Sequence, residues 1–349
     1  MARRRIAITG VSRFLGLRLA QALSESDEVG TLVGIDLDEP PISIPGLEFV
    51  RADIRSPLIA RVLEATKVDT LVHTNISSSP QFLGGRSQMK ENNVIGSMQL
   101  LAAAQRATRL KKVVMRSSSA IYGSGPAEPS LLPEDHAASQ VDLSGYGKDC
   151  AEAETYARDF GRRRPDVDLV ILRTQPVVGP TVRTSMTDYL SLPVIPTALG
   201  FDPRLQFLHE RDAVDALRQS IFRNCRGIFN IAADGVVYLS QAIRIIGRVE
   251  LPILLPLATT TASLLRRFET VDFPLDQLKL IVFGRVVDTS RAKEAFGFAP
   301  KFSTQQTIRD FKENRTDDYT VEPSNRRPGW ERELFDYLNR RSSRAKERV

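Results

Sequence analysis

Short apolar runs alternate with longer amphipathic segments through the first half of the chain. Each apolar run has the length of a buried strand, and each intervening segment is long enough for a crossover helix. Parallel strands need such crossovers, so the pattern predicts an α/β fold with a doubly wound parallel sheet that binds ligands at the carboxyl edge of its strands. The predicted strands are Ile6–Thr9, Thr31–Asp36, Leu47–Arg51, Thr70–Thr74, Lys112–Ser117 and Val167–Arg173. The predicted helices are Leu15–Leu23, Leu58–Glu64, Lys90–Gln105 and Cys150–Phe160.

The alternation loosens after residue 180, where prolines become frequent and the helical patterns become short. We therefore expect residues 1–180 to form a first domain whose sheet is shared with later segments. Residues 181–313 are expected to form a smaller C-terminal substrate-binding lobe that is interleaved with the main sheet. Residues 314–349 are polar and basic apart from the amphipathic stretch Trp330–Leu338, and are expected to form a peripheral tail.

Composition narrows the class of protein. Of the 349 residues, 42% are hydrophobic and 26% charged, as in ordinary soluble globular proteins. The net charge of +6 comes largely from basic residues at the two ends. These ends lack the interleaved aromatic residues that stack on bases, so we expect solvated tails and no nucleic-acid partner.

Cys150 and Cys225 make neither a disulfide framework nor a metal-ligand pattern, so we expect no metal and a reducing, cytoplasmic location. The N-terminus lacks a signal peptide, and no segment reaches the ~18 apolar residues of a transmembrane helix, so none is expected.

The run IAITGVSRFLG carries the strongest chemical signal. It combines a strand, a glycine turn at Gly10 and a helix that begins near Phe14 and Leu15 and contains Gly16. The N-terminus of a helix offers free N–H groups and a positive dipole end, which favour a pyrophosphate. The context of strand and helix predicts a dinucleotide-binding (Rossmann) turn, so residues 1–180 are expected to be the NAD(P)-binding Rossmann domain. The central position of the usual glycine spacing is Arg13. This side chain either blocks the backbone from the pyrophosphate or places a guanidinium on a phosphate.

Two acidic positions follow later strands at the same sheet edge. Asp36 ends the second strand, 20 residues after Gly16. A carboxylate there accepts hydrogen bonds from a ribose diol and repels a 2′-phosphate, so it favours NAD over NADP. Asp53, which is followed by Ile54, comes after the third strand. It is a candidate partner for the adenine amino group, and the alternative is a solvated loop acid.

Several separated motifs together resemble one family. The matching pieces are ITGVSRFLG, RADIR, LVHTN, ENNVIGSMQLLAAA, VVMRSSSAIYG, GYGKDCAEAE, ILRTQPVVGP, LQFLHERDAVDAL and GIFNIAADG. In this order they resemble the extended short-chain dehydrogenases/reductases of the NAD-dependent epimerase/dehydratase group, in the branch often labelled UDP-glucose 4-epimerase. The resemblance implies bound NAD, hydride transfer and a small-molecule substrate of the nucleotide-sugar class.

The resemblance also implies the catalytic positions. The family uses a Ser or Thr, which corresponds to Ser118, and a Tyr-x-x-x-Lys pair, whose tyrosine corresponds to Tyr146. The lysine, which lowers the phenol pKa and holds the cofactor ribose, corresponds to Cys150. A free phenol has a pKa of about 10, so loss of that cation is expected to slow proton abstraction by orders of magnitude. An alternative register places Ser144 and Lys148 in the site, but Lys148 points there only if the helix starts late or the register slips by two.

Further positions follow from the same resemblance. Asn93 matches an asparagine used structurally near the cofactor, while Thr74 and Asn75 stand where the family prefers small residues. Pro176 stands where related sugar-nucleotide enzymes often have an asparagine, and Arg204 is a candidate for a substrate phosphate. Besides the glycine-turn and acidic positions above, the expected cofactor-binding residues are Thr74, Asn75, Asn93, Cys150 and Gln175. The expected substrate-binding residues are Ser119, Pro176 and Arg204.

Two classes of function remain open at this stage. The first is an NAD-dependent enzyme that works by hydride transfer, such as a nucleotide-sugar epimerase or dehydratase or another oxidoreductase. The second is a non-catalytic nucleotide-binding, assembly or regulatory protein on the same fold, which the substitutions at Arg13 and Cys150 favour. A homodimer is expected, because the family packs the helices at Lys90–Gln105 and Cys150–Phe160 into its interface.

Overall fold

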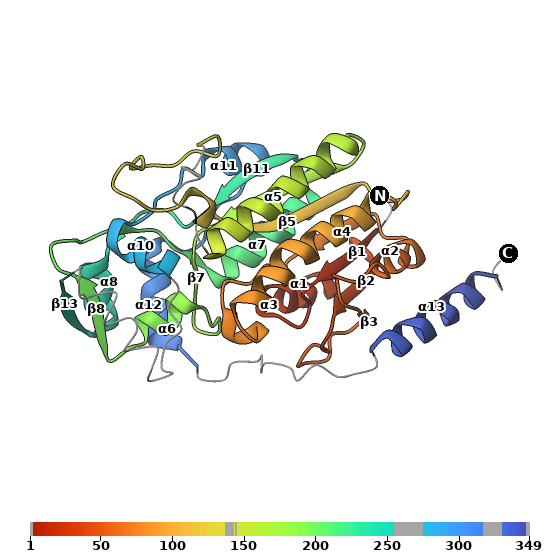
Figure 1. The fold of residues 1–349 in the computed structure, drawn as a ribbon, viewed down its shortest axis with the longest axis horizontal. Helices are drawn as coiled ribbons and strands as arrows, with labels where there is room; N and C mark the ends of the chain where they lie inside the picture. Colours follow the sequence, from red (N-terminus) through yellow and green to blue (C-terminus); the bar gives the residue numbers. More distant parts are fainter. Residues whose placement is uncertain (1–2, 137–142, 144, 255–274, 317–329, 347–349) are drawn as a thin grey trace.

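A computed structural model describes residues 3–136, 143, 145–254, 275–316 and 330–346. Its centre is a seven-stranded sheet in the order β11-β6-β5-β4-β1-β2-β3, in which all neighbouring strands are parallel (Figure 1). The expected doubly wound parallel sheet is therefore confirmed. In spatial order the strands are β11 (Gly227–Ile231), β6 (Asp168–Thr174), β5 (Lys112–Ser118), β4 (Thr70–His73), β1 (Arg4–Thr9), β2 (Val29–Asp36) and β3 (Leu47–Arg51).

Helices cover both faces of the sheet because successive strand residues point to opposite sides. In β1, Ala7 belongs to the apolar cluster under α2, α4 and α5, while Ile6 and Ile8 belong to the cluster under α1, α7 and α11. The helices on the first face are α2 (Ile59–Thr66), α4 (Ser97–Ala104) and α5 (Gly145–Arg163). Those on the second are α1 (Phe14–Ser24), α7 (Glu210–Phe222) and α11 (Ser290–Phe296).

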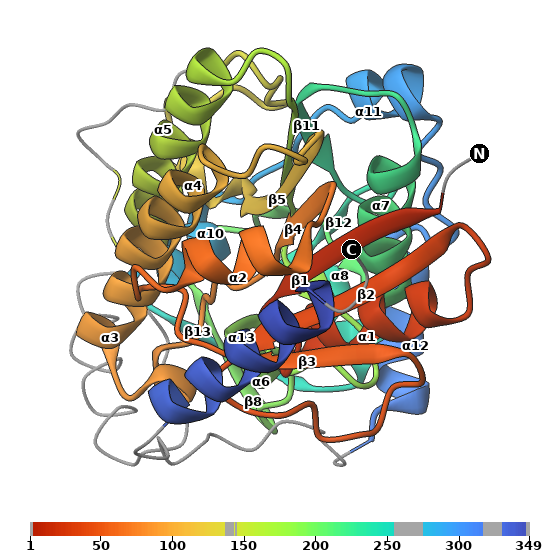
Figure 2. The same ribbon diagram turned by 90° about the vertical axis from the view of Figure 1, so that its right-hand side faces the viewer.

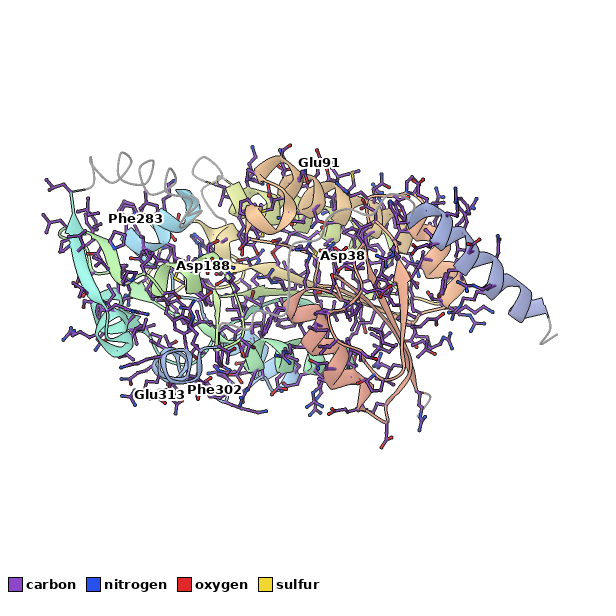
Figure 3. The ribbon with its side chains drawn as sticks, turned by 90° about the horizontal axis from the view of Figure 1, so that it is seen from below. Asp38, Glu91, Asp188, Phe283, Phe302 and Glu313 are labelled. Atoms are coloured by element: carbon purple, nitrogen blue, oxygen red, sulfur yellow. The ribbon has the colours of Figure 1, made fainter. Side chains whose placement is uncertain are left out.

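A smaller lobe with its own apolar cluster sits at the carboxyl edge of the sheet, at the opposite end of the molecule from α13, and Phe283 marks its position in Figure 3. The chain leaves the main sheet for this lobe and returns to it. Between elements of the lobe, β11 joins the main sheet, and α7 and α11 pack on one of its faces. The helices of the lobe are α6 (Ser185–Leu190), α8 (Leu239–Ile246), α10 (Leu275–Phe283) and α12 (Thr304–Asn314). Its short strand pairs are β7 (Val177–Val178) with β10 (Leu208–His209), β8 (Val194–Ala198) with β13 (Val249–Ile253), and β9 (Arg204–Leu205) with β12 (Val237–Tyr238).

The helix predicted at Lys90–Gln105 is present, but it starts earlier and is not a regular α-helix throughout. It runs from α3 (Arg86–Lys90) through a π-helical stretch η2 (Glu91–Gly96) into α4. A π-bulge inserts an extra residue into a helix and often marks a functional site. The helix predicted to begin at Cys150 in fact begins at Gly145, and the last strand of the sheet, β11, was not predicted as a strand.

The segment at residues 314–349 is less peripheral than predicted. Its helix α13 (Trp330–Lys346) lies across β3 and α2 (Figure 2). Leu334 is 1% exposed and belongs to the main apolar cluster. The Tyr337 hydroxyl donates a 2.7 Å hydrogen bond to Glu48, and Arg341 donates to the Ala65 carbonyl at 2.8 Å. This apolar and polar contact fixes part of the tail on the body.

Neither a membrane span nor a metal site emerges within the described ranges. No helix there is long and apolar enough to cross a bilayer. The same ranges contain no group of three or more His, Cys, Asp or Glu residues that could hold a metal ion.

His73, at the end of β4, is a packed structural histidine. Its Nδ1 lies 2.8 Å from the Thr9 hydroxyl and its Nε2 lies 2.9 Å from the Ser97 hydroxyl, so it joins β1, β4 and α4. Burial lowers the pKa of His73 from 6.5 to about 4. The ring is therefore neutral in the folded protein near neutral pH, where it exchanges hydrogen bonds with the two hydroxyls.

This lowered pKa predicts a loss of stability in acid. Between pH 6.5 and 4 the unfolded chain binds a proton at His73 that the folded protein does not, so the free energy of unfolding falls as pH falls. The expected total contribution is about 3 kcal/mol across this window. Denaturant unfolding at several pH values should show a shallower dependence for His73→Gln than for the unmodified chain. Equal slopes for the two proteins would contradict the assignment.

Candidate functional site

The turn after β1 requires both of its glycines. Gly10 has a φ of +78°, and a Cβ added there would lie 3.0 Å from the Asn75 Cα. A Cβ on Gly16 would lie only 2.1 Å from the Gly10 carbonyl oxygen, so α1 packs directly on the turn. No side chain caps α1, and its first turn contains no acidic residue, so the N–H groups of Phe14, Leu15 and Gly16 face the turn without a capping side chain. These are the features of a backbone anion site.

Arg13 fits this turn without strain. Its backbone is extended, with φ −93° and ψ 158°, which any residue adopts, and its N–H donates to the Gly10 carbonyl at 3.1 Å. The Nε atom of its guanidinium is buried and has no hydrogen-bond partner. An orphaned donor of this kind beside an uncapped helix N-terminus suits an anionic ligand.

Asp36 lies next to the same turn. Its Oδ2 accepts hydrogen bonds from the Ser12 hydroxyl at 2.5 Å and the Ser12 N–H at 3.2 Å, and its Oδ1 accepts from the Leu37 N–H at 2.8 Å. Burial raises the pKa of the Asp36 carboxyl, and the nearby charge of Arg13 and these hydrogen bonds oppose that rise. The Asp36 carboxylate thus lies at the end of β2 beside the glycine turn, and its contact with a ribose stays a prediction.

The segment after β3 contains Asp53 and Ile54, for which a contact with the adenine is predicted. Asp53 pairs with Arg55, whose Nη2 lies 2.5 Å from its Oδ2. Ile54 is 2% exposed and packs against Gly96 of η2, where a Cβ would come 2.7 Å from the Ile54 side chain. Because Gly96 has no side chain, η2 packs closely against Ile54.

Asparagines of η2 hold the loop that follows β4. The Asn93 side chain is fully buried, donates to the Ser77 carbonyl at 2.8 Å and accepts from the Ser77 N–H at 2.9 Å. Asn92 donates to the Asn75 carbonyl at 2.7 Å, and the Asn75 Oδ1 is buried without a partner. The Thr74 hydroxyl donates to the Thr9 carbonyl at 2.7 Å. Asn93 therefore fixes the loop that follows β4, and its predicted place near the cofactor stays a prediction.

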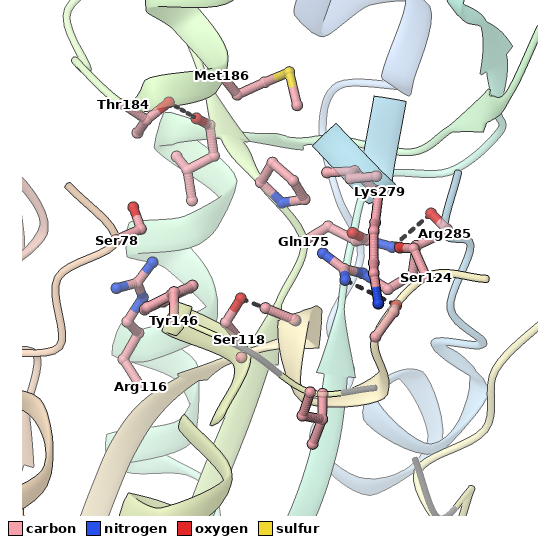
Figure 4. Close-up of a pocket in the computed structure, with 17 residues that line it drawn as sticks. Ser78, Arg116, Ser118, Ser124, Tyr146, Gln175, Thr184, Met186, Lys279 and Arg285 are labelled. Carbon is pink, nitrogen blue, oxygen red and sulfur yellow. Dashed lines mark hydrogen bonds between the residues drawn. The ribbon is translucent and has the colours of Figure 1, made fainter. Parts of the chain in front are cut away.

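A pocket opens between the sheet edge and the C-terminal lobe (Figure 4). Four predicted residues line it, namely Ser118, Tyr146, Gln175 and Pro176. Sequence reasoning missed the polar residues that complete the wall, which are Ser78, Arg116, Ser124, Thr184, Lys279 and Arg285. The lining contains three basic side chains and no carboxylate among the described residues. The pocket therefore favours an anionic ligand.

The start of α5 decides between the two registers considered for the catalytic helix. Tyr146 lines the pocket from the first turn, whereas Lys148 is exposed and lies outside the lining. The alternative register with Lys148 in the site is therefore wrong, because the helix begins at Gly145 and turns Lys148 outward. Its other member, Ser144, lies outside the described residues.

Cys150 cannot act as the missing cation. It is fully buried one helical turn after Tyr146, in the apolar cluster under α5, and it is not part of the pocket lining. Burial raises the pKa of its thiol to about 12, so the group is neutral. Burial also raises the pKa of the Tyr146 phenol, and the charge of Arg116 opposes this rise. The Tyr146 hydroxyl is buried without a hydrogen-bond partner, which leaves it free for a ligand.

Two residues predicted to contact the substrate, Ser119 and Arg204, do not line the pocket. Ser119 is fully buried behind the wall, where its hydroxyl donates to Gln175 at 2.9 Å and accepts from the Arg285 Nε at 3.2 Å. Arg204 lies outside the pocket and donates to the Ser130 carbonyl at 3.1 Å. Arg204 therefore does not line this pocket, and its predicted contact with a substrate phosphate stays a prediction. The basic residues of the lobe that line it, Lys279 and Arg285, come from α10 and the segment after it.

A buried network supports the site from behind. Glu154 of α5 and Arg173 of β6 form an ion pair with a closest N–O distance of 2.7 Å, and both side chains are 5% exposed or less. The Ser117 hydroxyl also donates to Glu154, and Arg173 donates to the Tyr122 hydroxyl at 2.8 Å. The network ties α5 to the strands whose ends carry the pocket residues.

Comparisons with known proteins agree with this architecture. The model of the NAD dependent epimerase/dehydratase family matches residues 6–232. The uncharacterized protein Rv0501 of Mycobacterium tuberculosis is 37% identical over 343 residues, which cover 97% of this chain and 91% of that protein. Among solved structures, UDP-glucose 4-epimerase of Thermotoga maritima with UDP-glucose superimposes with a TM-score of 0.69 at 18% identity, covering 88% of this chain and 97% of that one. UDP-glucuronic acid 4-epimerase of Bacillus cereus in complex with NAD gives a TM-score of 0.66 at 18% identity, with the same coverage.

Proposed function

The chain belongs to the NAD-dependent epimerase/dehydratase family, and from that premise we propose that it binds NAD at the glycine turn and transforms a nucleotide sugar in the pocket beside Tyr146. The observation that carries the proposal is the joint placement of two sites at one sheet edge. An uncapped helix N-terminus with its tight glycine turn follows β1, and a basic pocket with an unpartnered tyrosine follows β5.

The residues present fit the cofactor. The turn from Gly10 to Gly16 would hold the pyrophosphate, with the orphaned Arg13 donor close by. Asp36 would accept the ribose hydroxyls, which favours NAD over NADP. Asp53 and Ile54 would flank the adenine, and the buried orphan oxygen of Asn75 would face the nicotinamide side. When bound, NAD supplies the hydride acceptor and donor of the reaction.

The pocket suits a nucleoside diphosphate sugar. Arg116, Lys279 and Arg285 bring positive charge to it, and the Arg285 guanidinium is oriented by its bonds to Ser119 and the Gly123 carbonyl. Charged donors of this kind make strong hydrogen bonds to phosphate oxygens. Neighbours of the same fold contain UDP-glucose or UDP-glucuronic acid, which is consistent with this substrate class.

The proton chemistry falls to Ser118 and Tyr146. Ser118, 7% exposed, would align the substrate hydroxyl, and the Tyr146 oxygen would take its proton and later return it. Withdrawal and return of hydrogen at one carbon gives epimerisation, which we propose as the specific reaction. We also propose a cytoplasmic homodimer, whose contact includes the helical face of η2 and α4 where Ile95 is 41% exposed.

One observation favours a second function. The cation that the family places at position 150 is replaced by a neutral, buried thiol. The alternative is therefore a protein that binds NAD as a structural or sensing ligand and does not turn over a substrate.

Turnover of a panel of UDP-hexoses by the intact chain with NAD tests the choice. We expect conversion between epimers, and a fall in kcat of at least ~100-fold in Tyr146→Phe because the proton acceptor is lost. Tyr238→Phe, at a 47% exposed tyrosine outside the pocket, is the matched control and should retain full activity. NAD binding without conversion of any sugar in the panel would overturn the enzymatic proposal and support the alternative.

A further inference from the structure

We propose that Arg116 supplies the positive charge that Tyr146 needs, in place of the lysine that Cys150 replaces. Arg116 is then a positioning residue, because it acts on the substrate proton through Tyr146. This inference rests on the proposed function and assigns a further residue to the same site.

The strand places Arg116 beside the reacting groups. Arg116 and Ser118 are two residues apart on β5, so they point to the same side of the strand. Both line the pocket together with Tyr146, which approaches from α5. Figure 4 shows the Arg116 side chain next to Tyr146 on one side of the pocket, with Lys279 and Arg285 on the other.

The charge of Arg116 is not neutralised by an acidic partner. Among the described residues no carboxylate forms an ion pair with it, its Nη1 donates to the Ile76 carbonyl, and its Nε is buried without a partner. Arg173 of β6 lies two residues before the pocket residue Gln175. It differs from Arg116 because Glu154 forms an ion pair with it. A guanidinium remains charged at any pH that the protein tolerates. Arg116 therefore brings an uncompensated cation to the phenol.

The other charged groups near α5 do not take this role. Asp149 is paired with Arg86 at 2.6 Å, and Glu154 is paired with Arg173. Burial is the main cause that raises the pKa of the Tyr146 phenol, and Cys150, one helical turn away, adds a smaller rise. Arg116 is the nearby charge that lowers it.

The expected consequence is a more accessible phenolate. An adjacent cation favours the charged form of an acid, so it makes the Tyr146 oxygen a better acceptor for the proton of the substrate hydroxyl. On return of the hydride the phenol gives this proton back to the substrate oxygen, so no proton is gained or lost over the cycle.

A titration of Tyr146 tests the assignment without substrate or cofactor. The chain is labelled with carbon-13 at the tyrosine Cζ, and the Tyr146 signal is identified by its absence in Tyr146→Phe. In Arg116→Gln the midpoint of the Tyr146 titration is expected to rise by at least ~1 pH unit relative to the unmodified chain. Arg116→Lys should keep the midpoint near the original value, and Cys150→Lys in the Arg116→Gln background should bring it back down.

Two further measurements complete the test. In the pH profile of kcat/KM, the acidic limb should move to higher pH in Arg116→Gln, while NAD affinity measured by calorimetry stays the same. Arg116→Met, which keeps the apolar stem, replaces Arg116→Gln if that variant does not fold. An unchanged Tyr146 midpoint, or a Tyr146 that stays protonated in both proteins up to alkaline unfolding, overturns the inference. Absence of turnover with a shifted midpoint would instead overturn the proposed enzymatic function alone.

Discussion

Replacement of Arg173 by Met is expected to lower the free energy of unfolding by about 3–5 kcal/mol. The loss arises because Glu154, whose side chain is 0% exposed, would keep a negative charge without its main partner. Arg173 also donates to the Tyr122 hydroxyl, so α5 would lose its ion pair to β6 and keep only the hydrogen bond that Ser117 of β5 donates to Glu154. Chemical denaturation followed by circular dichroism measures the change.

A surface pair on the same helix provides the matched control. Arg162 pairs with Asp159 but its side chain is 75% exposed, so Arg162→Met should cost at most ~1 kcal/mol. The double variant Arg173→Met/Glu154→Leu should recover much of the lost stability, because no buried charge remains. Equal losses of stability in Arg173→Met and Arg162→Met would show that the buried Arg173–Glu154 pair stabilises the fold no more than the exposed Arg162–Asp159 pair does.

Gly16→Ala is expected to weaken NAD binding by at least ~100-fold, which corresponds to about 2.8 kcal/mol. The new Cβ would lie 2.1 Å from the Gly10 carbonyl oxygen and 2.9 Å from the Thr74 hydroxyl oxygen, so α1 must move away from the turn. That movement displaces the N–H groups that would hold the pyrophosphate. Calorimetric titration with NAD measures the affinity.

Gly125→Ala is the control for this substitution. Gly125 does not have a positive φ, and a Cβ there would meet no atom within 4 Å, so both affinity and stability should be unchanged. NAD affinity in Gly16→Ala equal to that of Gly125→Ala would show that the turn after β1 does not hold the cofactor.

The regular part of the fold could be predicted from hydrophobic periodicity. β3 spans Leu47–Arg51 as predicted, because Leu47, Phe49 and Val50 supply apolar positions directly after Gly46. β11 was not predicted as a strand, because its place is set by pairing with β6, more than 50 residues earlier in the chain. The start of α5 was also missed, since Gly145 and Gly147 are poor helix formers and their place in the helix depends on contact with η3 (Ser119–Tyr122).

The candidate site was only partly predictable. Gly10, Asp36 and Ser118 lie at or just after the ends of predicted strands, and Tyr146 belongs to a recognisable motif, so a linear pattern was enough to find them. Arg116 was missed although strand alternation with Ser118 provides the signal. Lys279 and Arg285 reach the pocket through the tertiary packing of the C-terminal lobe, which no local pattern describes.

The substitution at Arg13 shows the limit of motif reasoning. The central glycine of the usual spacing suggests that a larger residue cannot be accommodated. In this turn the residue has an extended backbone, so a side chain can leave the turn without strain. The charge near Asp36 and the orphaned Nε atom are properties of the folded turn that the sequence did not reveal.

Calorimetric titration of the unmodified full-length chain with NAD and with NADP tests the central claim most directly. We expect saturable heat for NAD with one site per chain, and weaker binding of NADP because its 2′-phosphate would meet the Asp36 carboxylate. Absence of heat with both dinucleotides would contradict the account, because the uncapped helix and glycine turn would then not form a cofactor site.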